Sequence, residues 1–311
     1  MKVLIVGYGS IAKKHIEALK SFPFDFEFYA LRSKSDAKEI KGIISFYSWE
    51  ELNVQLDFII VSNPTINHYE AIDQALKLNT PLFIEKPVLH SLAGANKLLE
   101  KISKAGTKTY VACNLRFHAC IEYAKSIVDS KKWGKVQEVN VYCGSYLPDW
   151  RPGQDFRTAY SANKSMGGGV HLDLIHELDY LYWMFGMPIS TTSLLRNSSS
   201  LGIDAIDYAN YTLQYEGFVT QVVLNYFRKD AKRTLEIVSE NGTIEIDLLS
   251  NEVRENKEIT LSLNENGFLS TYQSQMSYFI YEVLEKGKEM NSFAEALNVL
   301  KICLNNEEIR K

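Results

Sequence analysis

The chain is poor in cysteine and has no pair of cysteines at metal-ligand spacing. Its 311 residues include only Cys113, Cys120, Cys143 and Cys303, and no C-x-x-C motif occurs. Neither a structural zinc site nor a disulfide framework is therefore expected, and no metal is predicted. A reducing compartment, the cytoplasm, is the expected location.

Long apolar runs and a strong charge of one sign are also missing. No run reaches the length of about 20 residues that spans a bilayer, and the apolar start, residues 1–6, is too short for a signal peptide. The net charge is −4, which provides no general attraction to nucleic acid or to an anionic membrane. We therefore predict neither of these partners. The apolar share of 46% supports a sizeable core, and 311 residues suit two domains.

The first part of the chain alternates between short apolar strands and helical patterns. The expected strands are 2–6, 25–31, 43–46, 57–61, 81–84 and 108–113, and the expected helices are 10–20, 65–78 and 91–105. This alternation predicts a parallel sheet that is covered by helices on both faces. We assign residues 1–118 to a Rossmann domain that binds a dinucleotide.

Beyond residue 130 the pattern changes to long alternating segments that are separated by hairpin signals. The expected strands are 135–146, 207–215, 219–227, 233–239 and 243–248, and the expected helices are 170–185, 271–286 and 293–309. The polar segment 251–267 is interpreted as a loop or a ragged edge. Residues 119–311 are therefore predicted to form an α+β domain with a large, mostly antiparallel open sheet, whose last helix is free to pack back on the first domain.

A glycine-rich turn follows the first strand directly. Gly7 permits a tight turn into a helix, Gly9 lets a diphosphate approach the backbone, and Ala12 lets the helix lie against the sheet. Ser10 and Ile11 supply the first amides of that helix, whose positive end attracts phosphate. The pattern predicts binding of a dinucleotide cofactor.

The end of the second strand indicates which nicotinamide cofactor is preferred. An acidic residue there would bind the ribose 2′-hydroxyl of NAD, but Glu27 comes too early and Asp36 too late. Arg32, Ser33 and Lys34 occupy the position instead, and they suit a 2′-phosphate. The sequence thus favours NADP(H), with NAD(H) left open as the alternative.

Three further segments, together with the glycine turn, resemble the Gfo/Idh/MocA oxidoreductases, the family of glucose–fructose oxidoreductase and inositol dehydrogenase. The segments are Ser62-Asn63-Pro64-Thr65-Ile66-Asn67-His68, Pro81-Leu82-Phe83-Ile84-Glu85-Lys86-Pro87 and Gly167-Gly168-Gly169-Val170-His171-Leu172-Asp173-Leu174-Ile175-His176-Glu177-Leu178-Asp179. The resemblance covers the whole chain. It implies cofactor contacts from Ser62, Asn63, Pro64, His68, Glu85, Lys86 and Asn114.

Candidate catalytic residues come from two of these segments. Lys86 stands at the carboxyl end of a strand, where a lysine can donate to a substrate oxygen. Asp173 and His176 share one face of the expected helix, so the imidazole can accept a proton while the carboxylate orients it. Many members of the family space this pair four apart with an intervening glycine, whereas here the spacing is three. Which of Asp173 and His176 accepts the proton therefore stays open, and the altered form resembles a branch associated with bacterial surface sugars.

The segment before the triple glycine is rich in aromatic and charged residues. Rings that stack on sugar C–H surfaces and side chains that bind hydroxyls or an anionic group are typical of carbohydrate sites. With Lys86, Asp173 and His176, the predicted substrate-binding residues are Arg116, Trp150, Arg151, Arg157 and Tyr160.

These features predict an NADP(H)-dependent oxidoreductase that transfers hydride to or from a sugar, sugar acid or nucleotide sugar. Two alternatives remain open. The first is an epimerase, lyase or glycosidase that uses transient oxidation by a tightly bound cofactor, and the second is a non-catalytic protein that senses NADP or sugar. Because an open sheet needs covering, we expect a homodimer or homotetramer that associates through the C-terminal sheet.

Overall fold

The computed structural model describes residues 1–33, 38–263 and 267–305. The chain divides into two compact units, Met1–Asn114 with Thr271–Leu300, and Leu115–Ser270 with Lys301–Lys311. A late segment of the chain, Thr271–Leu300, therefore belongs to the first unit.

The described part of the first unit contains a six-stranded sheet in the order β3-β2-β1-β4-β5-β6, in which all neighbours are parallel. The strands are β1 (Lys2–Val6), β2 (Glu27–Leu31), β3 (Ile43–Phe46), β4 (Phe58–Val61), β5 (Leu82–Glu85) and β6 (Thr109–Ala112). Every residue of β4 is fully buried, as a strand covered on both faces requires. The predicted Rossmann sheet is confirmed. Its order reverses between β1 and β4, where such sheets bind ligands at the carboxyl ends of their strands.

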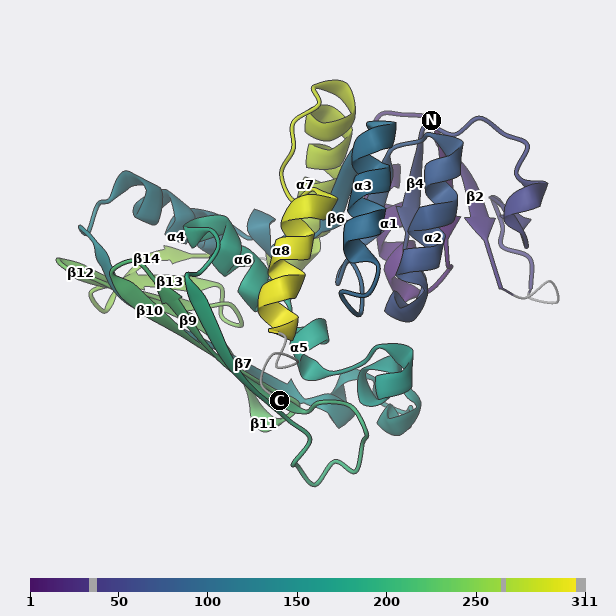
Figure 1. Ribbon diagram of the computed structural model, residues 1–311. Helices are drawn as coiled ribbons and strands as arrows, with labels where there is room; N and C mark the ends of the chain where they lie inside the picture. The colour runs from purple at the N-terminus through teal and green to yellow at the C-terminus, as the bar shows by residue number, and fades with distance from the viewer. Residues whose placement is uncertain (34–37, 264–266, 306–311) are drawn as a thin grey trace. The chain divides into compact units, whose positions relative to one another are not determined.

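Helices from both ends of the chain cover this sheet. They are α1 (Ser10–Lys20), α2 (His68–Ala75) and α3 (Ala95–Ala105), with α7 (Gly267–Ser277), a π-helical segment (Tyr278–Glu285) and α8 (Phe293–Leu304) following much later. In Figure 1, α2 and α3 run side by side in front of the strands. Phe279 packs edge-on against Phe58 and Phe83 at ring distances of 5.2 and 5.3 Å. The late segment thus completes the core of the first unit.

The second unit contains an eight-stranded sheet in the order β14-β13-β12-β11-β7-β10-β9-β8 within the described residues. The strands are β7 (Val136–Tyr146), β8 (Ser190–Arg196), β9 (Tyr208–Tyr215), β10 (Phe218–Asn225), β11 (Phe227–Ser239), β12 (Gly242–Asp247), β13 (Glu252–Glu255) and β14 (Glu258–Ser262). All neighbours are antiparallel except β7 and β10. The mostly antiparallel sheet is therefore confirmed.

Several elements of this unit differ from the prediction. The segment 251–267, interpreted as a loop or a ragged edge, contains β13 and β14, and β14 is the edge strand of the sheet, so the second interpretation holds. The helix expected at 170–185 is broken into α5 (Val170–Asp173) and α6 (His176–Phe185). α4 (Ala119–Ser130) was not predicted at all. Figure 1 shows α4 and α6 over the same face of the sheet.

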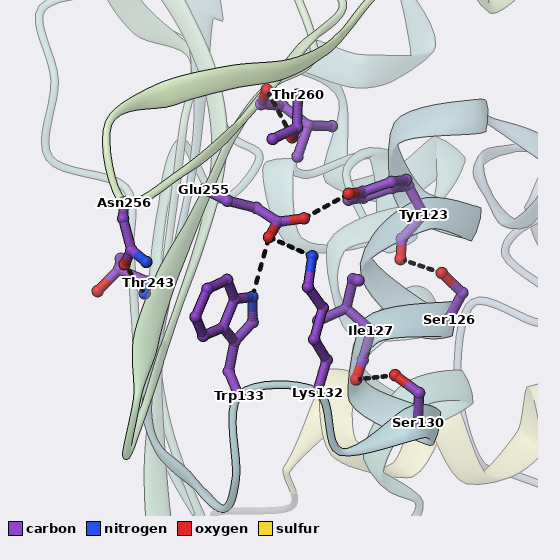
Figure 2. A network of polar contacts seen from close by, with 11 residues as sticks. Tyr123, Ser126, Ile127, Ser130, Lys132, Trp133, Thr243, Glu255, Asn256 and Thr260 are labelled. Atoms are coloured by element: carbon purple, nitrogen blue, oxygen red, sulfur yellow. Dashed lines mark hydrogen bonds and ion pairs between the residues drawn. The ribbon is translucent and has the colours of Figure 1, made fainter.

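Glu255 on β13 ties the edge of the sheet to the end of α4. Its buried carboxylate accepts hydrogen bonds from the Tyr123 hydroxyl, from Lys132 Nζ at 2.6 Å and from Trp133 Nε1 at 3.1 Å. Figure 2 shows these three donors converging on one side chain. Because the donors come from α4 and the loop after it, the network holds this helix on the sheet and fixes β13, the strand next to the edge.

Within the ranges that the structure describes, every helix is too short or too polar to traverse a lipid bilayer.

Candidate functional site

The turn after β1 has a shape that only glycine allows at Gly7. Its φ is +85°, and an added Cβ would lie 2.5 Å from Cα of Asn63 and 2.7 Å from the backbone nitrogen of that residue. The Gly7 amide donates to the Leu31 carbonyl at 3.0 Å, and its own carbonyl accepts from the Ser62 hydroxyl at 2.9 Å. The turn is therefore clamped between the ends of β2 and β4.

Gly9 differs from Gly7, because nothing in the protein requires it to be glycine. An added Cβ there would meet no atom within 4 Å, and φ is −98°. Gly9 precedes α1, where Ser10 is exposed, Ile11 is half-buried and Ala12 is fully buried. Open space beside uncapped helix amides is what an incoming diphosphate requires. These residues therefore fit a dinucleotide.

His68 joins two of the segments that the sequence singled out. Its ring is 1% exposed, with Nδ1 at 3.0 Å from the Pro87 carbonyl oxygen and Nε2 at 3.0 Å from the Asn63 carbonyl oxygen. Burial lowers the pKa of His68, against the backbone carbonyls, which favour its charged form. The ring thus braces the segment containing Ser62, Asn63 and Pro64 against the turn after β5. This placement favours a positioning role for His68.

A buried pair that the sequence analysis missed lies behind Lys86. His15 on α1 is fully buried, and its Nε2 lies 2.5 Å from Oε1 of Glu85. The other carboxylate oxygen of Glu85 accepts from the Lys86 amide at 3.2 Å. The Lys86–Pro87 peptide bond is cis. The helix that starts at the glycine turn is thus bonded directly to the strand end that presents the candidate catalytic lysine.

The remaining cofactor candidates lie at the ends of two strands. Asn114 follows β6 and is 7% exposed, and its amide donates to the Thr271 hydroxyl at 2.7 Å. Arg32 follows β2, and its guanidinium donates to the Lys38 carbonyl at 2.9 Å, which holds it at the strand tip. Ser33 is exposed beside it, whereas Lys34 lies outside the described residues.

In the second unit, the three consecutive glycines serve different purposes. Gly167 has φ +82° after a short 3₁₀ turn, and Gly169 has φ +135° before α5. At Gly168 the limit is space, because an added Cβ would lie 2.0 Å from the carbonyl oxygen of Tyr160. The segment carrying Tyr160 therefore packs directly against the entry to α5.

Every acid of the motif that runs from Asp173 to Asp179 has a distant partner. Asp173 accepts from the Tyr226 hydroxyl, and Glu177 accepts from Arg233 Nε at 2.7 Å. Asp179 forms a bidentate salt bridge with Arg116, with both nitrogen–oxygen distances at 2.8 Å. All three acids are at most 5% exposed. The sequence analysis identified neither Tyr226 nor Arg233, because no local spacing connects them to the motif.

Arg116 lies deeper in the protein than a substrate-binding residue would. It is 1% exposed, its guanidinium is paired with Asp179, and it lies 5.9 Å from the ring of Trp183. This placement favours a structural role for Arg116 over the predicted contact with substrate.

The break between α5 and α6 changes how Asp173 and His176 are placed. Leu174 has φ −98° and ψ 29°, outside helical geometry, so the two side chains do not share one continuous helix face. Asp173 is buried, and His176 is half-buried at the first position of α6. Burial lowers the pKa of the neighbouring His171 to about 4, which makes it a weak proton acceptor near neutrality.

The aromatic segment places Trp150 beside the Asp173 partner. The rings of Trp150 and Tyr226 meet edge-on at 5.3 Å, and Trp150 Nε1 donates to the Ser145 hydroxyl at 2.8 Å. Arg151 and Arg157 are both exposed, and Arg157 lies 3.6 Å from Asp155 in an exposed ion pair. The second unit thus packs Trp150 against Tyr226, the hydrogen-bond partner of Asp173, and leaves two arginines exposed to solvent.

Two family models match the chain. The model of the oxidoreductase family with an NAD-binding Rossmann fold matches residues 1–113, and the model of the GFO/IDH/MocA C-terminal domain matches residues 121–245. Among curated proteins, the uncharacterized oxidoreductase YrbE of Bacillus subtilis (strain 168) is 26% identical over 234 residues, which are 71% of this chain and 65% of the relative. Myo-inositol 2-dehydrogenase of Thermotoga maritima is 26% identical over 200 residues, which are 61% of this chain and 56% of the relative.

Solved structures share the fold over nearly the whole chain. Levoglucosan dehydrogenase, in complex with NADH and levoglucosan, has a TM-score of 0.83 at 16% identity and covers 97% of this chain and 95% of its own. GenD2 from gentamicin A biosynthesis, in complex with NAD, has a TM-score of 0.78 at 19% identity, with coverage of 97% and 92%. At these identities the likeness establishes the fold alone.

Proposed function

Since the chain belongs to the Gfo/Idh/MocA oxidoreductase family, we propose that it is a nicotinamide-dependent oxidoreductase acting on a CH–OH group of a sugar. The first unit would hold the dinucleotide and the second the substrate. The observation that carries the proposal is the contrast between Gly7, which its own backbone surroundings force to be glycine, and Gly9, which faces open space at the start of α1.

The candidate chemistry depends on three side chains. In the oxidative direction His176 accepts the proton of the substrate hydroxyl, Asp173 orients it, and Lys86 donates a hydrogen bond to the same oxygen. The nicotinamide supplies a hydride acceptor or donor when it is bound. The bonds from the Lys86 amide to Glu85 and from the Tyr226 hydroxyl to Asp173 support this assignment, because the first holds the backbone of Lys86 and the second holds the side chain of Asp173.

NADP(H) is the proposed preference. Arg32 is held at the tip of β2 by its bond to the Lys38 carbonyl, with Ser33 exposed next to it, and the strand ends without an acidic residue. A cation and a hydroxyl at this position suit a 2′-phosphate, whereas a 2′-hydroxyl would lack its usual acceptor. Titration with NADP⁺ and NAD⁺ tests the preference. Arg32→Ala should weaken NADP⁺ binding and leave NAD⁺ binding nearly unchanged.

The proposed substrate is a sugar, a sugar acid or a nucleotide sugar, consistent with a role in bacterial surface polysaccharides. The names of similar proteins include a myo-inositol 2-dehydrogenase and a levoglucosan dehydrogenase, which supports a polyol or sugar ring. Trp150 offers an aromatic surface, and the exposed Arg151 and Arg157 favour an anionic group on the substrate.

A substrate panel tests the function directly. Turnover would be followed at the nicotinamide absorbance band with NAD⁺ and NADP⁺ against myo-inositol, levoglucosan, glucose 6-phosphate, glucuronate and a nucleotide sugar. Lys86→Ala and His176→Ala should each reduce kcat by at least about 100-fold. Variants that stay within a few-fold of the wild type would refute the assignment. A cofactor that co-purifies and shows no net reduction during turnover would instead indicate the redox-assisted epimerase or lyase.

A homodimer or homotetramer that associates through the open face of the eight-stranded sheet remains part of the proposal. A hollow of about 510 Å³ lies on this sheet and carries both signs of charge, including Lys232, Glu236 and Arg254. Such a face suits a second copy of the same surface. Light scattering measures the oligomeric state. The four cysteines, all within the described residues, are buried as thiols, which supports a reducing compartment such as the cytoplasm.

A further inference from the structure

Tyr226 is the single residue that connects β10 to β11 in the second unit. β10 ends at Asn225 and β11 begins at Phe227, and β7 lies between these two strands in the sheet. The single residue therefore crosses the end of β7. Its carbonyl accepts from the Leu147 amide at 2.8 Å, and its amide donates to the Asp207 carbonyl at 3.0 Å. With both backbone groups bonded, the backbone from which the side chain projects is held in place.

The side chain of Tyr226 points at the candidate catalytic acid. The residue is fully buried, its hydroxyl donates to Oδ2 of Asp173, and the Trp150 ring meets it edge-on with an interplanar angle of 89°. Burial, followed by the charge of Asp173, raises the pKa of Tyr226 well above its usual value. The phenol therefore remains a hydrogen-bond donor at any working pH.

Asp173 needs such a partner because its own helix does not orient it. α5 ends at Asp173, and Leu174 leaves helical geometry before α6 begins at His176. The carboxylate is therefore not held in register with His176 by a continuous helix. The hydroxyl of Tyr226, donated from the crossing between β10 and β11, constrains the orientation of this carboxylate.

We propose that Tyr226 is a positioning residue for the reaction, acting by holding the Asp173 carboxylate in the orientation that serves His176. This inference rests on the proposed function, since it assigns a role to Asp173 in turnover. It extends that function to a residue outside every motif of the sequence, one that lies 53 residues from its partner along the chain.

The chain offers a matched control in Tyr211. This residue is also fully buried, its hydroxyl donates to the Cys303 carbonyl at 2.8 Å, and its pKa is likewise raised well above the usual value by burial. Tyr211→Phe and Tyr226→Phe each remove one buried hydroxyl and keep the ring. Both should lower the melting temperature similarly, by about 2–4 °C. Stability alone would therefore not separate them.

Kinetics would separate them, using a sugar of the panel that the wild type turns over. Tyr226→Phe should lower kcat by about 10- to 100-fold, with the KM for the dinucleotide changed less than about twofold, because only the placement of a reacting group is disturbed. Tyr211→Phe should retain kcat within about twofold, because its hydroxyl bonds to Cys303 and not to Asp173. Equal kcat values for the two variants would overturn the assignment.

A second variant keeps the test independent of how well Tyr226→Phe folds. Asp173→Asn should lose at least as much kcat, and adding Tyr226→Phe to it should cause no further loss, because the hydroxyl acts through that carboxylate. Independent, multiplying losses would overturn the inference. If the wild type shows no nicotinamide-linked turnover on the whole panel, the proposed function itself fails. Normal wild-type turnover with an unaffected Tyr226→Phe refutes only the role of Tyr226.

Discussion

The glycine turn of the first unit and the acidic motif of the second are built in opposite ways. The turn is defined by backbone atoms, because Gly7 fits against Asn63 and Gly9 leaves space beside the first amides of α1. The motif from Asp173 to Asp179 is held by side-chain hydrogen bonds, and the partners of its three acids lie 53, 56 and 63 residues away along the chain. A backbone device is visible as a short sequence pattern. When a site is made of pairs that are distant in the sequence, a local motif reveals only one residue of each pair.

The largest effect is expected where the motif is most deeply paired. Asp179→Ala leaves the guanidinium of Arg116 charged, 1% exposed and without its carboxylate. The free energy of unfolding should fall by about 3–5 kcal/mol, measured by urea denaturation. The matched control is the double variant Arg116→Met with Asp179→Leu, which removes both charges and should recover most of the loss. A single variant as stable as the wild type would show that the pair contributes little.

The pH dependence of the unfolding free energy tests whether His171, which lies next to the same motif, is buried in its neutral form. Burial lowers the pKa of His171 to about 4, below the unfolded value, so the unfolded chain binds its proton first. The stability contributed by neutral His171 is present above about pH 6.5 and is lost as the pH falls toward about 4. His171→Gln should reduce this acid-induced loss by about 3 kcal/mol in urea denaturation between those pH values. An unchanged pH dependence would mean that His171 is not buried without charge.

Much of the first unit was predictable from the sequence, and the reason is local. β4 is continuously apolar because it is buried on both faces, and the strand ends carry the glycine turn, Ser62 and Lys86 in recognisable patterns. What the patterns missed in this unit is the pair of His15 and Glu85, 70 residues apart. A histidine on an amphipathic helix looks the same whether or not a carboxylate faces it.

The second unit was predictable in class but less so in detail. Alternation identified β7, β9 and β10, whereas the polar segment with β13 and β14 could not be distinguished as a loop or a ragged edge, because an exposed edge strand is polar like a loop. Apolar periodicity continues through Leu174 and Ile175, so the break between α5 and α6 leaves no trace in the pattern. Periodicity records which side chains are buried and does not record where backbone hydrogen bonds are interrupted.

Two alanine substitutions at the glycine turn would sharpen the contrast between fold and function. Gly7→Ala places a Cβ 2.5 Å from Cα of Asn63 at φ +85°, so it should cost about 2 kcal/mol of stability and also weaken dinucleotide binding. Gly9→Ala meets nothing within 4 Å, so the unfolding free energy should change by less than about 0.5 kcal/mol. Dinucleotide affinity, measured by calorimetry, should nevertheless fall. If the affinity of Gly9→Ala for the dinucleotide is unchanged, the open space beside Gly9 is not part of the cofactor site.

The smallest effect on stability is expected at Arg157. Its ion pair with Asp155 is exposed on both sides, with 57% of each side chain accessible. Arg157→Ala should change the free energy of unfolding by less than about 0.5 kcal/mol. If this arginine binds an anionic group, the KM for an acidic sugar should rise while the KM for a neutral one stays constant. Equal KM changes for both sugars would remove Arg157 from the substrate site.

All four cysteines of the chain lie within the described residues and are buried thiols outside any disulfide, one in the first unit and three in the second. Burial raises the pKa of Cys120 to about 11 and that of Cys303 to about 12, so little reactive thiolate forms while the protein is folded. An alkylating reagent should therefore modify each sulfur only when its surroundings transiently open. Mass spectrometry of the modified peptides would then give the rate of local opening around Cys113 separately from the rates around the other three cysteines, with no engineered label.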